Sequence, residues 1–172
     1  MANNDERLVN IVKSLDRVND NTKKMVFEMA QSMTELEIIQ SFNQQSFDTF
    51  NLLIHISRKM QKDDICKMDG YKKLFENAIK INVKLPVDKF TILILEYASE
   101  IYGEEEDCFL KMSIPDTNIN VSNEFGIVRS KMFQDLWKLL GQKDKSDIKG
   151  HFILLTTFAH AFFYKTLLQN QK

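Results

Sequence analysis

The chain has 172 residues, which is enough for one domain with a sizeable hydrophobic core. Hydrophobic residues make up 44% of it and charged residues 27%, proportions that are typical of a folded globular protein. Only 5 Gly and 2 Pro are present, too few for the many tight turns of a sandwich or barrel, so composition favours long helices. The formal net charge of -1 gives no overall attraction to nucleic-acid phosphates or anionic lipid.

The N-terminus and the cysteines predict an intracellular protein. Residues 1–7 are polar and acidic and contain no apolar stretch of the signal-peptide kind. Cys66 and Cys108 are the only cysteines, and we expect both thiols to be free in a reducing compartment. We therefore expect a cytoplasmic or nuclear location and no secretion.

Apolar residues recur at alternating three- and four-residue spacing through residues 5–40. This spacing is typical of a coiled-coil seam, but also of amphipathic helices that pack on their own domain. We favour the second interpretation, because a seam and a core stripe look alike over this length. Asn19 and its neighbours could also end one helix and cap the next. The expected domain organisation is one all-helical domain over residues 1–172. Residues 1–42 could form a separate oligomerising segment and 43–172 the globular bundle.

The middle of the chain predicts three further helices. A break is expected at 44–46, with Ser46 as a cap, before a helical face that runs from residue 47 to 60. A second helix follows over residues 71–82. Pro86 interrupts the chain, and Asp88 is expected to cap a mostly buried helix over 88–102 that ends at Gly103.

The C-terminal third contains the most apolar segment of the chain. We expect a loop over 113–122, an amphipathic helix from Val121 that Gly141 ends, and a charged turn at 142–147. Residues 151–168 are apolar on nearly every side of a helix, so that helix must be buried in a core or a membrane. A membrane span needs about 20 apolar residues, and this segment is shorter and contains Lys165. We therefore expect an all-α bundle of about six to eight helices, with 151–168 and 88–102 at its hydrophobic centre.

The sequence contains no recognisable catalytic, metal-binding or cofactor-binding motif. His55, His151 and His160 lie in apolar helical contexts, without the Glu-x-x-His or His-Glu-x-x-His spacing of helical metal sites. Glycine-rich phosphate loops and the Gly-x-Ser-x-Gly elbow are also missing from the sequence. We therefore expect a protein that is not an enzyme and binds no cofactor or metal.

His160 has polar neighbours on the apolar terminal helix. Thr156, Thr157 and Tyr164 lie one turn away and could form a polar strip with it. The strip could line a ligand site or respond to pH. We favour instead a buried imidazole that is hydrogen-bonded to Tyr164 or to a backbone carbonyl.

The favoured function is protein–protein interaction by a scaffold, adaptor or accessory regulatory subunit. A viral or phage origin is one that we consider. An apolar helical seam or groove would bind another protein or a second copy of the chain, and methionine-rich helices suit such adaptable contacts. Neither nucleic acid nor a membrane is the expected partner. The partner-binding residues from this hypothesis are Leu8, Leu15, Met25, Met29, Leu36, Phe133 and Trp137.

Two alternatives remain open at this point. One is an accessory protein that binds nucleic acid, with phosphate contacts from a basic cluster. The cluster comprises Arg58, Lys59, Lys62, Lys72 and Lys73. The other is a groove that binds amphipathic helices in the Bcl-2-like manner, although residues 123–129 lack the Asn-Trp-Gly-Arg run of those cell-death regulators.

Overall fold

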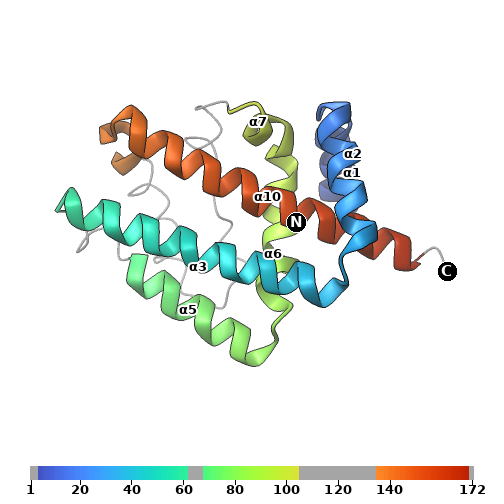
Figure 1. Ribbon diagram of the computed structural model, residues 1–172, viewed down its shortest axis with the longest axis horizontal. Helices are drawn as coiled ribbons and strands as arrows, with labels where there is room; N and C mark the ends of the chain where they lie inside the picture. Colours follow the sequence, from blue (N-terminus) through green and yellow to red (C-terminus); the bar gives the residue numbers. More distant parts are fainter. Residues whose placement is uncertain (1–3, 62–67, 105–134, 171–172) are drawn as a thin grey trace.

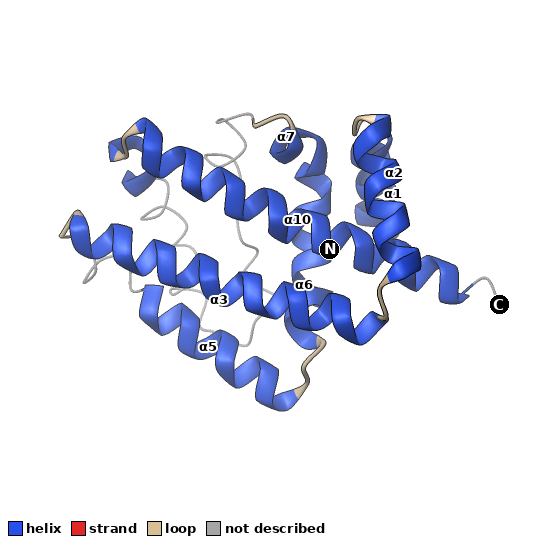
Figure 2. Cartoon of the chain, in the orientation of Figure 1, coloured by secondary structure: helices blue, strands red, loops and turns tan. Residues whose placement is uncertain are grey.

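The computed structural model describes residues 4–61, 68–104 and 135–170, and within these ranges the chain is helical, with no strand (Figures 1 and 2). The prediction of an all-α bundle is thus confirmed. In chain order the helices are α1 (Asn4–Asp16), α2 (Asp20–Ser32), α3 (Glu35–Lys59), α5 (Met68–Ile81), α6 (Leu85–Ile94), the 3-10 helix η1 (Leu95–Tyr97), α7 (Ala98–Tyr102) and α10 (Gln142–Asn170). Residues 135–139 are also helical. The loop expected at 113–122 lies outside the described residues.

Helix α10 occupies the centre of the bundle and packs against α2, α3, α6 and α7 (Figure 1). It buries apolar side chains in several directions around its axis, among them Ile148, Leu155, Ala159 and Phe162. Its most extensive contact is with α3, so the predicted pairing of 151–168 with 88–102 describes only part of the centre. Among the described helices, none combines the length and apolar character that a membrane span requires.

The charged turn expected at 142–147 is wrong, because α10 already begins at Gln142. The amide of Lys145 donates to the carbonyl of Gly141 at 3.1 Å, as in a first helical turn. Asp144 lies in that turn, where a carboxylate is favourable at the positive end of the helix dipole. A charged run can therefore extend a helix when its side chains remain near solvent.

Residues 5–40 belong to three helices and not to one continuous seam. Asn19 caps α2 by accepting a hydrogen bond from the amide of Asn21 at 2.8 Å, and Thr34 caps α3 through the amide of Glu37 at 3.1 Å. Helix α1 packs on α6, η1 and α7, while α2 packs on α10. The suggested boundary between residues 42 and 43 falls inside α3.

The break predicted at 44–46 is also wrong, because α3 runs without interruption for 25 residues. The Ser46 hydroxyl donates to the carbonyl of Phe42 at 2.9 Å, within the same helix. The side-chain amide of Asn43 donates to the carbonyl of Val83 at 3.1 Å and so joins α3 to the α5–α6 connection. These polar residues therefore lie inside a continuous helix and do not end it.

The helix expected over 88–102 begins three residues earlier and is interrupted by η1. Pro86 lies in the first turn of α6, where its missing N–H removes no helical hydrogen bond. Asp88 is therefore a first-turn residue and not the cap. The expected end at Gly103 is confirmed, although Gly103 has a helical φ of -78° and the positive φ of 56° belongs to Glu104.

Candidate functional site

Helix α1 presents three large apolar side chains to solvent, which we call the α1 strip. Leu8 is 47% exposed, Val9 51% and Val12 45%. Ile11 and Leu15, on the adjoining side of the helix, are buried in the core, so the helix is anchored while the strip remains exposed. Exposed apolar side chains that are neighbours on one helix are typical of a surface for protein contacts.

A surface cleft of about 560 Å³ lies beside α1. Its lining combines both signs of charge and is formed by Asn10, Lys13, Asp16, Arg17, Glu96, Tyr97 and Glu100. An ion pair with 3.6 Å between Arg17 Nη2 and Glu100 Oε1 joins the turn after α1 to α7. Because the opposite charges already pair within the cleft, the lining is not organised around one simple ion.

The seam residues predicted to bind a partner lie on three different helices and differ in burial. Leu8, Met25 and Leu36 are about half exposed, but they lie on α1, α2 and α3 respectively. Leu15 is buried in the core, and Met29 packs against the core from α2. The regular spacing in the sequence therefore mixes core positions with surface positions.

Of the aromatic face predicted around Phe133 and Trp137, the structure describes Trp137, and this residue is part of the core. Trp137 is only 2% exposed, and the ammonium group of Lys145 lies 5.7 Å from the centre of its ring. Phe133 lies outside the described residues. Trp137 thus contributes to the packing of this domain and is not accessible to a partner.

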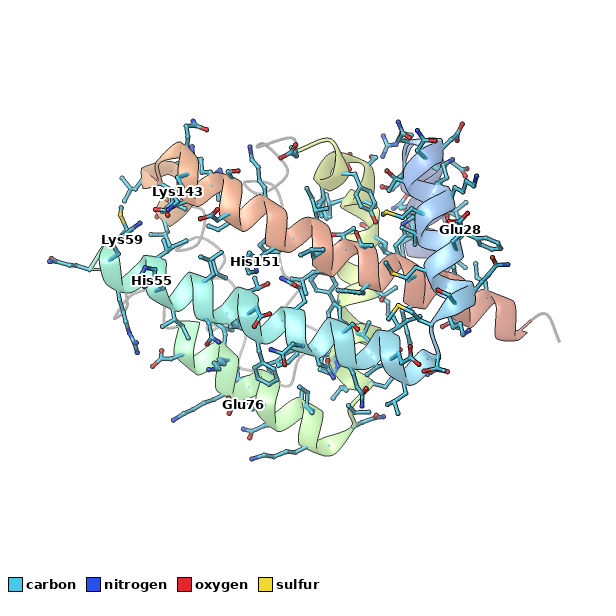
Figure 3. The ribbon with its side chains drawn as sticks, viewed as in Figure 1. Glu28, His55, Lys59, Glu76, Lys143 and His151 are labelled. Atoms are coloured by element: carbon cyan, nitrogen blue, oxygen red, sulfur yellow. The ribbon has the colours of Figure 1, made fainter. Side chains whose placement is uncertain are left out.

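The basic cluster spans the end of α3 and the start of α5, and two of its lysines are already engaged. Lys59 forms a salt bridge with Asp144 at 2.8 Å, near the labelled His55 and Lys143 in Figure 3. Lys72 donates to the side-chain oxygen of Asn51 at 2.9 Å. Arg58 and Lys73 are exposed, and Lys62 is outside the described ranges. The cluster therefore offers fewer free cations for phosphate than the sequence indicates.

His160 is fully buried where α10 meets α7. Its Nδ1 lies 3.2 Å from the hydroxyl of Tyr102, and its ring lies 4.4 Å from that of Tyr164, centre to centre. The favoured interpretation of a buried, hydrogen-bonded imidazole holds, but the expected partner, Tyr164 or a backbone carbonyl, is corrected to Tyr102. Burial, with a smaller effect of the Lys23 charge, lowers the pKa of His160 to about 4.

The two tyrosines of this cluster are partly buried against the core. Burial raises the pKa of Tyr102 to about 12, so its hydroxyl stays protonated beside the neutral imidazole. Because these groups pack against the core, we assign the cluster a structural role.

The two remaining histidines differ in environment. His151 Nδ1 lies 2.9 Å from Gln45 Nε2 and 3.2 Å from Thr49 Oγ1, which links α10 to α3, whereas His55 is exposed on α3 (Figure 3). Within the ranges that the structure describes, His, Cys, Asp and Glu side chains form no group that could hold a metal ion.

Two adjacent threonines on α10 make a matched pair for stability measurements. Thr157 donates to the carbonyl of Ile153 at 2.7 Å, whereas the buried hydroxyl of Thr156 has no hydrogen-bond partner among the described atoms. We expect Thr156→Val to raise the free energy of unfolding by about 1 kcal/mol, because it removes an unpaired buried hydroxyl. Thr157→Val should lower it by about 1 kcal/mol. Urea unfolding measures the change in the free energy of unfolding for each variant. A destabilised Thr156→Val protein would show that the Thr156 hydroxyl is paired in the original protein.

The comparisons with known proteins place the chain in a family. It is 56% identical over 167 residues to uncharacterized protein R465 of Acanthamoeba polyphaga mimivirus, covering 97% of this chain and 93% of that protein. This similarity shows that the chain belongs to the family of R465. The relative is viral, in agreement with the viral origin considered from sequence. No family model matches the chain, and no solved structure matches it.

Proposed function

We propose that this member of the R465 family is a non-enzymatic helical module that binds another protein. The observation that carries the proposal is the α1 strip of Leu8, Val9 and Val12, which is exposed on a helix that Ile11 and Leu15, on its adjoining side, anchor in the core. The expected role is that of a scaffold, adaptor or accessory subunit.

The strip suits an apolar protein surface. An aliphatic side chain gains about 1.5–3 kcal/mol when it becomes fully buried, and each of these three still exposes about half of its surface. The neighbouring Lys13 and Asp16 can supply a polar rim around the apolar contact. A small apolar centre with charged surroundings favours a specific and reversible contact over a permanent one.

The position of the contact can be tested with a photo-reactive residue introduced in place of Val9. We expect irradiation to give one discrete covalent product, either with a single partner protein or with a second copy, which mass spectrometry distinguishes. The same residue in place of Ile92, which is 41% exposed on α6, is the matched control and should give no such product.

Serine at positions 8 and 12 should abolish the Val9 product, because it removes the apolar surface beside the reactive group. Equal labelling from positions 9 and 92, or labelling that persists in the Leu8→Ser/Val12→Ser protein, would refute the proposal. Recovery of nucleic acid as the main product would refute the α1 strip as a protein contact.

A further inference from the structure

The 3-10 segment η1 separates α6 from α7 and interrupts the regular helix between them. Its last residue, Tyr97, has φ -108° and ψ 12°, which departs from the α-helical backbone. The amide of Ser99, in the first turn of α7, donates to the hydroxyl of Ser14 on α1 at 3.2 Å. A 3-10 stretch between two helices often marks a hinge, and here it would let α7 turn relative to α6.

Helix α1 is tied to the segment beyond this hinge. It packs most extensively on η1 and also contacts α7. Besides the bond from Ser99 to the buried Ser14 hydroxyl, Arg17, directly after α1, forms an ion pair with Glu100 on α7. Helix α2, in contrast, packs on α10. A movement of α7 would therefore carry α1 with it.

The side chain of Tyr102 joins the end of α7 to α10. Its hydroxyl lies 3.2 Å from Nδ1 of His160, across the contact between the two helices. The imidazole is fully buried, and its Nε2 has no hydrogen-bond partner among the described atoms. Protonation makes both ring nitrogens donors, so Nε2 would carry an N–H without an acceptor and with a positive charge. Both changes disfavour the packed arrangement of α7 on α10.

The charges around His160 offer no compensation for a proton on the ring. Lys23, on α2, is the charged residue that acts on the imidazole, and its charge is also positive. Asp16, at the end of α1, acts instead on Tyr164, one turn along α10. Within the described ranges, α3, α6, η1 and α7 supply no charged group that shifts the pKa of His160. A protonated ring would gain water only if α7 moved away.

We propose that His160, beyond its part in the packing, is an acid-sensitive latch whose protonation releases α7 and α1 from α10 by a turn at η1. The rest of the bundle would stay folded, while Ala98 and Ile101 on the inner side of α7 would become exposed. A switch of this kind requires a buried histidine and an element that can separate, and the hinge and the contact with Tyr102 supply both. The latch does not depend on the role proposed for the α1 strip.

Amide hydrogen exchange of the full-length chain, followed by mass spectrometry at pH 7, 5 and 4, tests the latch. The rates are expressed as protection factors, which removes the intrinsic effect of pH on exchange. We expect protection across η1 and α7 to fall about a hundredfold from pH 7 to pH 4, because opening restores the ordinary pKa of the imidazole. A low urea concentration should not change it, because a local opening exposes little surface. Amides of α3 should be better protected at each pH and should respond to urea.

Three variants identify the group that controls the opening. His160→Gln should abolish the fall of α7 protection with pH, whereas His55→Gln, which changes an exposed imidazole, should retain it. Tyr102→Phe removes only the hydroxyl and should lower α7 protection about fivefold at pH 7 without affecting α3. Circular dichroism establishes that each variant remains folded.

Three results would overturn the proposal. If α7 and α3 show the same protection and the same response to urea at pH 4, the chain opens only by global unfolding. If His160→Gln retains the fall with pH, another group binds the proton. Unchanged α7 protection in Tyr102→Phe would overturn the latch as well, even if His160→Gln fails to fold.

Discussion

Leu155→Glu is expected to lower the free energy of unfolding by about 4 kcal/mol or more, a large fraction of the stability of a typical domain. Leu155 is 4% exposed near the middle of α10, the helix that contacts α2, α3, α6 and α7. Glutamate at this position would remove apolar burial and place a carboxylate where no positive partner is available in the described core, and both changes disfavour the folded state. Urea unfolding followed by far-UV circular dichroism measures the effect.

The neighbouring residue provides a control with the same chemistry. Leu154 is 46% exposed, so Leu154→Glu should change the free energy of unfolding by no more than about 0.5–1 kcal/mol. A stable Leu155→Glu protein would mean that α10 is not the central helix. Equal destabilisation by both substitutions would mean that the exposed side of α10 is covered in solution.

The long apolar pattern near the C-terminus was sufficient to predict the central helix of the bundle. Residues 151–168 are apolar on most sides, and the structure packs that helix against several others, although Leu154 and Leu167 remain 46% and 44% exposed. Helix α5 ends at Ile81, next to the end predicted at 82, and the capping role suggested for Asn19 is confirmed. These features depend on local spacing and local hydrogen bonds, which a single sequence contains.

The helix boundaries that were predicted wrongly have a common physical cause. A polar residue can end a helix, but it can also lie inside one and bond to its backbone. Ser46 bonds to a carbonyl of its own helix, and the charged residues at 142–147 form the solvated start of α10. Composition alone does not distinguish these roles. They depend on which other helices lie next to the residue, and this information is not local.

The candidate sites were predicted less completely, because exposure depends on tertiary packing. Leu8 and Leu15 occupy equivalent positions of the same seven-residue pattern, yet one is 47% exposed and the other 5%. Val9 and Val12 lie off the predicted seam and were missed. Tyr102 is separated from His160 by 58 residues, so no local pattern could have paired them.

The free energy of unfolding is expected to fall by about 3 kcal/mol as the pH is lowered from 7 to below 4, through His160 alone. The pKa of His160 is lowered from an ordinary 6.5 to about 4 in the folded protein. Between these values the unfolded chain binds more protons than the folded one, so acid favours unfolding. The contribution is fully present above pH 6.5 and is lost as the pH falls through 4. A difference of about 2.5 pKa units corresponds to about 3 kcal/mol.

This contribution can be isolated by comparing two histidine variants with the original protein. His160→Gln should remove about 3 kcal/mol of the pH dependence measured by urea unfolding between pH 7 and 4, although it also changes the stability at neutral pH. His55→Gln removes an exposed imidazole and should retain the full pH dependence. If His160→Gln loses stability with acid as steeply as the original protein, protons bind elsewhere during unfolding and the buried imidazole is not the sensitive group. A variant that becomes insensitive between pH 6.5 and 4 would establish that His160 must stay neutral for α10 to remain packed beside Tyr102.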